Sequence, residues 1–326
     1  MTAHEQMTVR EQRGRVEFRQ LEYFVALARE QHFARAAASC YVSQPALSAA
    51  IGKLERELDV SLIQRDHAFQ GLTPEGERIV EWARRILADR DSLTAEAHAG
   101  RQGLTGTLRL GAVPSASTTV ALPIEAFCAA HPQVSVQVRS RLTASEIRRC
   151  LREFELDAAL TYLDADDHAG LLVEPLYTER AVLILPDGMV DPDLRRITLR
   201  AAAALPLTLI DQRMHTRDLV DRALRAAGLA VSPQLETDSI AMLYAAVSTG
   251  RWASIVPHSW VHTFGLGGGF RVLPLTEPEL TATVGVARSA ALQGSSVARA
   301  FAAVAVGMRL DDVLDLAALT GGRDRA

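Results

Sequence analysis

Hydrophobic positions near the amino end of the chain recur with helical spacing in three short segments, which predict three helices. The first helix begins at Phe18, and the second covers the alanine-rich stretch 33–38. The third opens at Ser43, a good N-cap, and tolerates Pro45 because amides of the first turn lack partners within the helix. Its buried stripe comprises Leu47, Ile51, Leu54 and Leu58. A charged segment with a turn follows, so this order predicts a winged helix-turn-helix over 18–73.

The outer face of the third helix is narrow and mostly small, which would let its backbone lie close to bases in the major groove of DNA. We expect Gln44 and Ser48 to contact bases. Short alanine-rich helices also build ordinary bundles, so periodicity alone leaves that alternative open. The predicted DNA-binding residues, including basic residues for phosphates, are Arg35, Ser43, Gln44, Pro45, Ser48, Ala49, Lys53, Arg65 and Thr73.

Segment 18–77 resembles the DNA-binding domain of LysR-type transcriptional regulators. The resemblance rests on the stretches LEYFVALA, HFARAAA, VSQPALS and LTPEG. Residues downstream to about position 310 also resemble the family's effector-binding part. Family members usually carry Arg or Gln where this chain has Ala49, and Phe where it has Gln64. The departure at 49 shifts the expected base readout towards Gln44, Ser48, Lys53 and the wing.

From Thr73-Pro74 to about Ala99 the pattern predicts one long linker helix. Apolar residues at spacings of three and four, interrupted by Arg90, are typical of a two-helix seam. A helix packed on its own domain is the alternative. The resemblance implies antiparallel pairing of linker helices into a homodimer and assembly into a homotetramer. The predicted dimerisation residues are Ile79, Ala83, Ile86 and Leu93, and residues 100–106 form a hinge.

Beyond Gly106, strands and amphipathic helices alternate up to Met308, which predicts a parallel sheet covered on both faces. The resemblance implies a C-terminal α/β domain of the periplasmic-binding-protein type. Its two subdomains would cover 107–176 with 273–312, and 177–272, with crossings near Leu176 and Val272. The fold class is therefore α/β multidomain. We expect a disordered leader over 1–17 and a flexible tail over 313–326.

A small effector is expected in the cleft between these subdomains, where strand ends meet helix starts. Hydroxyls and free amides at a helix starting near Ser117 would suit a carboxylate or another small anion. Plain N-capping is the alternative. Asp238 would repel an anion, so it would instead contact a donor group or cap the next helix. The predicted effector-binding residues are Ser115, Ser117, Thr118, Tyr162, His215, Thr216, Asp238 and Ser239.

The charge balance argues against DNA binding through bulk positive charge, because 35 Lys and Arg face 39 Asp and Glu. Affinity must come from a few placed basic residues and from several copies binding together. Three scattered cysteines, Cys40, Cys128 and Cys150, fit core positions, with a redox role left open. No apolar run is long enough for a membrane span, so we expect a cytoplasmic protein.

No catalytic motif such as GxSxG, a Walker loop or HExxH occurs, so we expect no enzymatic activity and no cofactor. His258 and His262 lie four apart without a neighbouring carboxylate, which favours a polar helix face over a metal site. The predicted function is a DNA-binding transcriptional regulator switched by an anionic organic effector, with RNA polymerase as a further candidate partner. The alternative is a solute-binding protein, but that class needs a signal sequence and no DNA-binding head.

Overall fold

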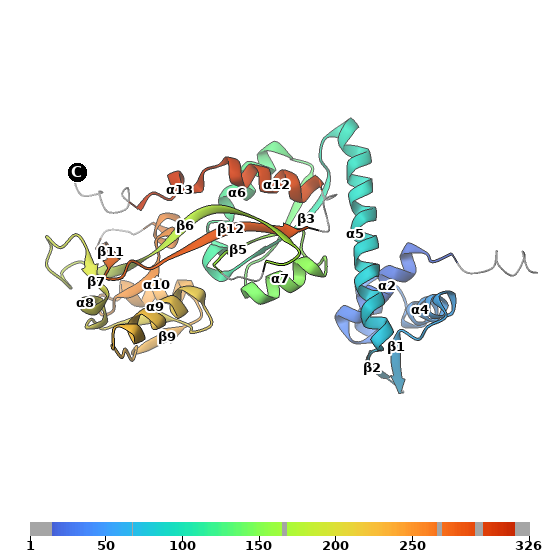
Figure 1. The fold of residues 1–326 in the computed structure, drawn as a ribbon, viewed down its shortest axis with the longest axis horizontal. Coiled ribbons are helices and arrows are strands. Elements are labelled where there is room, and N and C mark those ends of the chain that lie inside the picture. The colour runs from blue at the N-terminus through green and yellow to red at the C-terminus, as the bar shows by residue number, and fades with distance from the viewer. Residues whose placement is uncertain (1–14, 67, 165–167, 266–268, 291–295, 317–326) are drawn as a thin grey trace, which may run out of the picture. The chain divides into compact units, whose positions relative to one another are not determined.

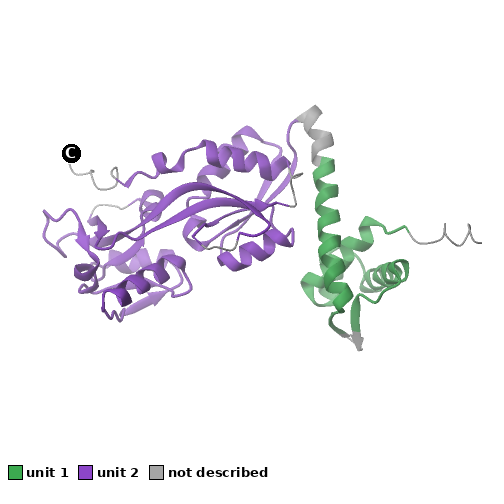
Figure 2. Cartoon of the chain, viewed as in Figure 1, with its two compact units in different colours: residues 1–97 green, residues 98–326 purple. Residues whose placement is uncertain are grey.

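The computed structural model describes residues 15–316, except 67, 165–167, 266–268 and 291–295. The chain divides into two compact units, residues 1–97 and 98–326 (Figure 2). Most of the predicted leader and the end of the predicted tail lie outside the described residues. The two units are described separately below.

The described part of the first unit contains three helices, a two-stranded wing and most of a fourth, long helix (Figure 1). On α4, Leu47, Ile51 and Leu54 are fully buried, as the helical spacing predicts. The Ser43 hydroxyl accepts a hydrogen bond from the amide of Ala46 at 3.4 Å and caps this helix. The elements are α2 (Phe18–Glu30), α3 (Phe33–Ser39), α4 (Gln44–Leu58), β1 (Ile63–Asp66), β2 (Ala68–Leu72) and the long helix α5 (Pro74–Gln102).

Helix α5 starts against the wing at a tight backbone contact. The Thr73 hydroxyl accepts from the amide of Gly76 at 2.9 Å and donates to the carbonyl of Ser61 at 2.6 Å. A Cβ atom on Gly76 would lie 2.1 Å from the carbonyl oxygen of Leu62, so only glycine fits this approach. The first turn of α5 is therefore fixed to its own domain.

The second unit is built on one mixed sheet with the strand order β4-β3-β5-β12-β6-β11-β7, and β10 pairs with β6. Strand β3 runs parallel to β4 and β5, whereas β12 is antiparallel to both β5 and β6. The prediction of a parallel sheet is therefore wrong for the long central strands. The strands are β3 (Gly106–Ala112), β4 (Val134–Arg139), β5 (Ala158–Tyr162), β6 (Leu171–Pro186), β7 (Ile197–Thr198), β10 (Ser254–Pro257), β11 (Phe270–Thr276) and β12 (Thr281–Ser289).

Helices cover this sheet in two groups, one for each half of the unit (Figure 1). A separate parallel pair, β8 (Thr208–Ile210) and β9 (Leu235–Thr237), belongs to the second half. The helices of the first half are α6 (Ala121–Ala130), α7 (Ala144–Arg152), α12 (Ser296–Gly307) and α13 (Leu310–Val313). Those of the second half are α8 (Leu199–Ala203), α9 (His215–Ala226), α10 (Ile240–Ser248) and α11 (His258–Phe264).

Strand β6 belongs to both halves of the second unit. It pairs with β12 as far as Arg180 and with β10 and β11 from Ala181 onward. Leu176 packs in the first hydrophobic core and Leu183 in the second. The crossings between halves thus lie after Arg180 and between β11 and β12, rather than at Leu176 and Val272.

Candidate nucleic-acid interface and ligand cavity

The outer face of α4 is the most open helical surface of the first unit that carries predicted site residues. Gln44, Pro45 and Ala49 are exposed, and Ser48 is half-buried on the same face. The opposite face of α4 packs into the hydrophobic core of the unit. This arrangement leaves short side chains and one amide available to a partner.

Basic side chains around this face differ in how strongly the protein already holds them. Lys53, the only lysine in the sequence, lies 2.6 Å from Glu17, whose hydrogen bond raises the pKa of Lys53. Arg35 donates to the carbonyl of Glu30 at 2.6 Å. Arg56 has no partner in the described part of the chain, and its guanidinium lies over Gly52 on the outer face. The predicted residue set omitted Arg56, although the helical spacing places it there.

Two of the predicted DNA-binding residues, Arg65 and Thr73, belong to the wing or directly follow it. Strands β1 and β2 pair antiparallel, with Arg65 opposite Phe69, but the side chain of Arg65 lies outside the described residues. The Thr73 hydroxyl caps α5, and its predicted contact with DNA stays a prediction. Tyr41 is 96% exposed in the turn before α4, a feature that the hydrophobic pattern did not identify.

Only some of the predicted dimerisation residues are exposed on α5. Ala83 is 1% exposed and packs in the core of its own unit, and Ile79 packs partly against that core. The prediction of a seam residue is therefore wrong for Ala83, because the same helical period also faces its own domain. Arg90 likewise turns inward and pairs with Glu22 at 2.5 Å. The exposed apolar side chains are Trp82, Ile86 and Leu93.

A cavity of about 930 Å³ lies in the second unit, with walls from both halves. Six of the predicted effector residues line it, whereas Thr118 and Thr216 do not. Residues that the sequence reasoning missed include Arg141 and Arg213, which lie in loops without a periodic pattern. The predicted residues that line the cavity are Ser115, Ser117, Tyr162, His215, Asp238 and Ser239.

The predicted anion cradle at a helix start near Ser117 is wrong in its geometry. Residues Pro114–Ser117 form a short 3-10 helix, and α6 begins only at Ala121. The Ser117 hydroxyl donates to the carbonyl of Pro114 at 2.6 Å, and Ser115 Oγ lies 2.5 Å from the hydroxyl of Tyr162. The hydroxyls of this loop therefore support the backbone and Tyr162.

A buried polar cluster joins the two halves beneath the cavity. The Tyr162 hydroxyl donates to Glu179 at 2.6 Å, and Thr216 donates to the same carboxyl oxygen at 3.3 Å. The ring of His215 stacks on Tyr162 with centroids 3.8 Å apart. Burial raises the pKa of Glu179 to about 7 and lowers the pKa of His215 below its usual 6.5. The Trp260 indole also donates to the carbonyl of Ser115 at 2.8 Å.

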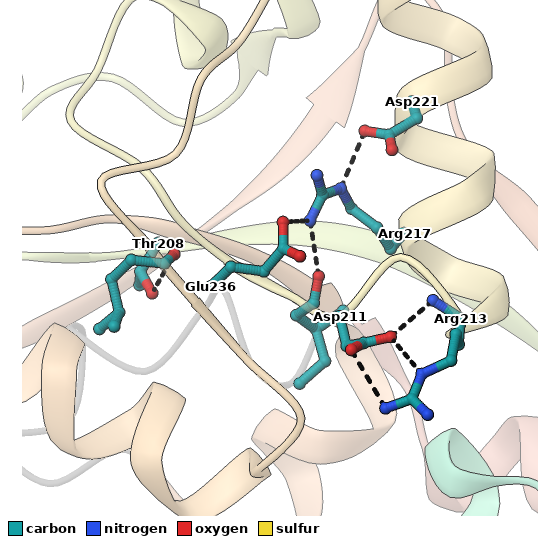
Figure 3. A network of polar contacts seen from close by, with 8 residues as sticks. Thr208, Asp211, Arg213, Arg217, Asp221 and Glu236 are labelled. Carbon is teal, nitrogen blue, oxygen red and sulfur yellow. Dashed lines mark hydrogen bonds and ion pairs between the residues drawn. The ribbon is translucent and has the colours of Figure 1, made fainter.

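Arg217 fixes the wall of the cavity in the second half. Its side chain is 5% exposed and donates to the carbonyl of Ile210 at 2.7 Å, to Glu236 at 2.8 Å and to Asp221 at 2.9 Å (Figure 3). Ile210 ends β8 and Glu236 lies on β9, so one guanidinium ties both strands to α9. The loops after these strands carry Asp211, Arg213 and Asp238 into the cavity wall.

His258 does not belong to a polar helix face. It is 2% exposed, and its Nδ1 accepts from the amide of Arg180 at 3.1 Å. Burial lowers its pKa to about 4. Among the described residues, no three His, Cys, Asp or Glu side chains converge on a point that could hold a metal ion. In that same part of the chain, no helix is both long and apolar enough to cross a membrane.

A helix-turn-helix joined to a two-part domain that encloses a cavity defines the class of ligand-responsive DNA-binding proteins. Residues 18–77 match the family model "Bacterial regulatory helix-turn-helix protein, lysR family", and residues 101–308 match "LysR substrate binding domain". The chain belongs to the LysR family of transcriptional regulators. The unit 1–97 therefore contains its DNA-binding domain and the unit 98–326 its effector-binding domain, and the two are called the DNA-binding unit and the effector-binding unit below.

Curated relatives and solved structures extend over most of the chain. It is 32% identical over 243 residues to a "Probable hydrogen peroxide-inducible genes activator" of Mycobacterium avium, which covers 74% of this chain and 78% of the relative. A full-length OxyR variant of Pseudomonas aeruginosa is 28% identical with a TM-score of 0.70, covering 90% and 98% of the two chains. CbnR in complex with its target DNA shares the fold at 22% identity, with a TM-score of 0.59 and coverage of 89% and 98%.

Proposed function

We propose that this regulator contacts its operator through the outer face of α4, with Gln44 and Ser48 at base edges and Arg56 at phosphates. The observation that carries the proposal is that α4 is buried on one face and exposed on the other. On the exposed face the Arg56 guanidinium, which has no partner among the described residues, lies beside small side chains. Lys53, Arg35 and Arg65 are further phosphate contacts in the proposal. Lys53 would first have to leave Glu17.

Mobility shifts with genomic fragments, over a series of salt concentrations, test this interface. Gln44→Ala should cost about 1–3 kcal/mol and relax specificity at one position. Arg56→Ala should weaken binding to all sequences alike and reduce the salt slope by about 1. Arg29→Ala is a matched control, since this arginine is exposed on α2 and pairs with Glu30. An unchanged salt slope for Arg56→Ala would show that Arg56 does not contact a phosphate.

We further propose that two chains pair through the exposed stripe Trp82, Ile86 and Leu93 on α5 and that dimers join into tetramers. Burial of these side chains by a second copy would account for their exposure in a single chain. Ile86→Asp should abolish dimers because it places an unpaired charge in the seam. Light scattering should then report a monomer, and an intact oligomer would refute the assignment.

The effector, in this proposal, binds in the cavity without a covalent bond to a cysteine. The relatives are named for a response to hydrogen peroxide, but neither Cys40, Cys128 nor Cys150 lines the cavity of this chain. Burial raises the pKa of Cys150, which lowers its reactivity. We also propose a cytoplasmic location, which the family's action on genomic DNA supports. Contact with RNA polymerase is a further proposal, tested by transcription in vitro.

A further inference from the structure

Two side chains of opposite charge in the cavity wall, one from each half, approach each other without a hydrogen bond. Arg141 follows β4 in the first half, and Asp238 follows β9 in the second. Their closest nitrogen and oxygen atoms are 3.8 Å apart, beyond hydrogen-bond distance. The side chains are 89% and 59% exposed, so the pair contributes little stability and is easily displaced.

The other charged groups of the cavity wall already have partners. Asp211 holds Arg213 at 2.9 Å, and Asp218 holds Arg222 at 3.1 Å. Glu146 accepts a hydrogen bond from the backbone amide at the start of α7, at 2.8 Å. Arg141 and Asp238 are therefore the charged side chains of this wall that can most readily form ion pairs with a ligand.

We propose that the effector is a small zwitterion whose carboxylate binds Arg141 and whose ammonium group binds Asp238. This inference rests on the proposed function, because it takes the cavity as the effector site. Among the described cavity-lining residues, four carboxylates oppose two guanidiniums, and burial lowers the pKa of the His215 ring below its usual value. A simple anion would meet excess negative charge in this wall, and a simple cation would leave Arg141 facing a like charge.

The rest of the wall indicates an apolar body for this ligand. Val113, Pro114, Ala144, Met214 and Ile240 also line the cavity. An amino acid with an apolar side chain is the simplest molecule that combines all three features. Since Arg141 and Asp238 come from opposite halves, such a ligand would bridge the halves and favour the arrangement in which both contacts form.

Thermal-shift and titration experiments on the full chain with a matched series test the ligand class. The series is L-leucine, 4-methylpentanoate, which lacks the amine, and 3-methylbutan-1-amine, which lacks the carboxylate, with the corresponding sets for methionine and phenylalanine. We expect the amino acids to raise the melting temperature of the chain, and we expect the acids without an amine and the amines without a carboxylate to leave it unchanged. Arg141→Gln and Asp238→Asn should each weaken binding by about tenfold or more. Asp193→Asn and Arg195→Gln are matched controls, since both residues are exposed outside the cavity.

Two results would overturn the inference. One is that the acid without an amine binds as tightly as its amino acid, and the other is that no amino acid of the series binds at all. The swap variant Arg141→Asp with Asp238→Arg gives a further check, because it should restore part of the binding that each single change removes. Mobility shifts on the wild-type chain distinguish failure of the ligand inference from failure of the proposed function. If DNA binding is retained but amino acids have no effect, only the ligand class is refuted. If the chain does not bind DNA, the proposed function is refuted.

Discussion

Replacing Glu179 with glutamine should stabilise the effector-binding unit above neutral pH. Glu179 is 2% exposed, and burial raises its pKa from 4.5 to about 7. Below about pH 4.5 the carboxyl is protonated in both the folded and the unfolded chain. Between about 4.5 and 7 only the unfolded chain releases the proton, so the free energy of unfolding falls as pH rises. Above about pH 7 the folded state carries the full cost of a buried carboxylate.

The size of this effect follows from the shift in pKa. One pKa unit corresponds to about 1.4 kcal/mol, so the cost above neutral pH is about 3 kcal/mol. Glutamine keeps an oxygen that accepts hydrogen bonds from Tyr162 and Thr216 but carries no charge. We therefore expect Glu179→Gln to gain up to about 3 kcal/mol at about pH 8 and to gain little at about pH 5.

Urea unfolding of both proteins over this pH range, followed by circular dichroism, measures the difference directly. The lowered pKa of His215 acts in the opposite direction, but it cancels when the variant is compared with the wild type at each pH. Glu174→Gln is a matched control, because this half-exposed glutamate lies on the same strand. A Glu179→Gln protein that is less stable than the wild type at about pH 8 would refute the assignment of a costly buried carboxylate.

Three further substitutions, one of them compared with a substitution at a second glycine, test other parts of the structure by urea unfolding. Arg217→Met should destabilise the effector-binding unit by about 2–3 kcal/mol, because a buried carbonyl and two carboxylates lose their donor; a neutral effect would refute its positioning role. Trp260→Phe should cost about 1–3 kcal/mol by leaving the Ser115 carbonyl without its indole donor, and an unchanged midpoint would count against that bond. Gly76→Ala should cost about 2–3 kcal/mol through overpacking, whereas Gly52→Ala, in an open helical position, should gain about 0.5–1 kcal/mol; equal effects would contradict the contact geometry.

Local sequence signals were enough to predict the helices of the DNA-binding unit, since these depend on apolar residues at helical spacing and on side-chain caps. The Ser43 cap and the stripe from Leu47 to Leu54 are confirmed because both depend on neighbours within the same helix. Ala83 was assigned to the wrong surface for a related reason. The helical period identifies an apolar face, but it does not say whether the same domain or a second chain covers that face.

The cavity was less accessible to sequence reasoning, because tertiary contacts assemble it. Arg141 and Arg213 lie in loops between elements, where no periodic pattern marks a residue. Glu179 lies within β6 between Thr178 and Arg180, and nothing in this polar stretch of sequence indicates burial. A buried glutamate is rare, and only the packing of both halves around it reveals its role.

The 16 residues of β6 have a mechanical consequence for the response to an effector. A loop hinge concentrates motion in a few backbone torsions. A strand that is hydrogen-bonded in both halves behaves differently, because the two halves can rotate relative to each other only if the twist of the strand changes. That change is shared by many residues, so each moves little and the restoring force rises smoothly with angle. Signal transmission through such an elastic strip should tolerate single substitutions along β6 and respond in graded fashion to ligands of different size.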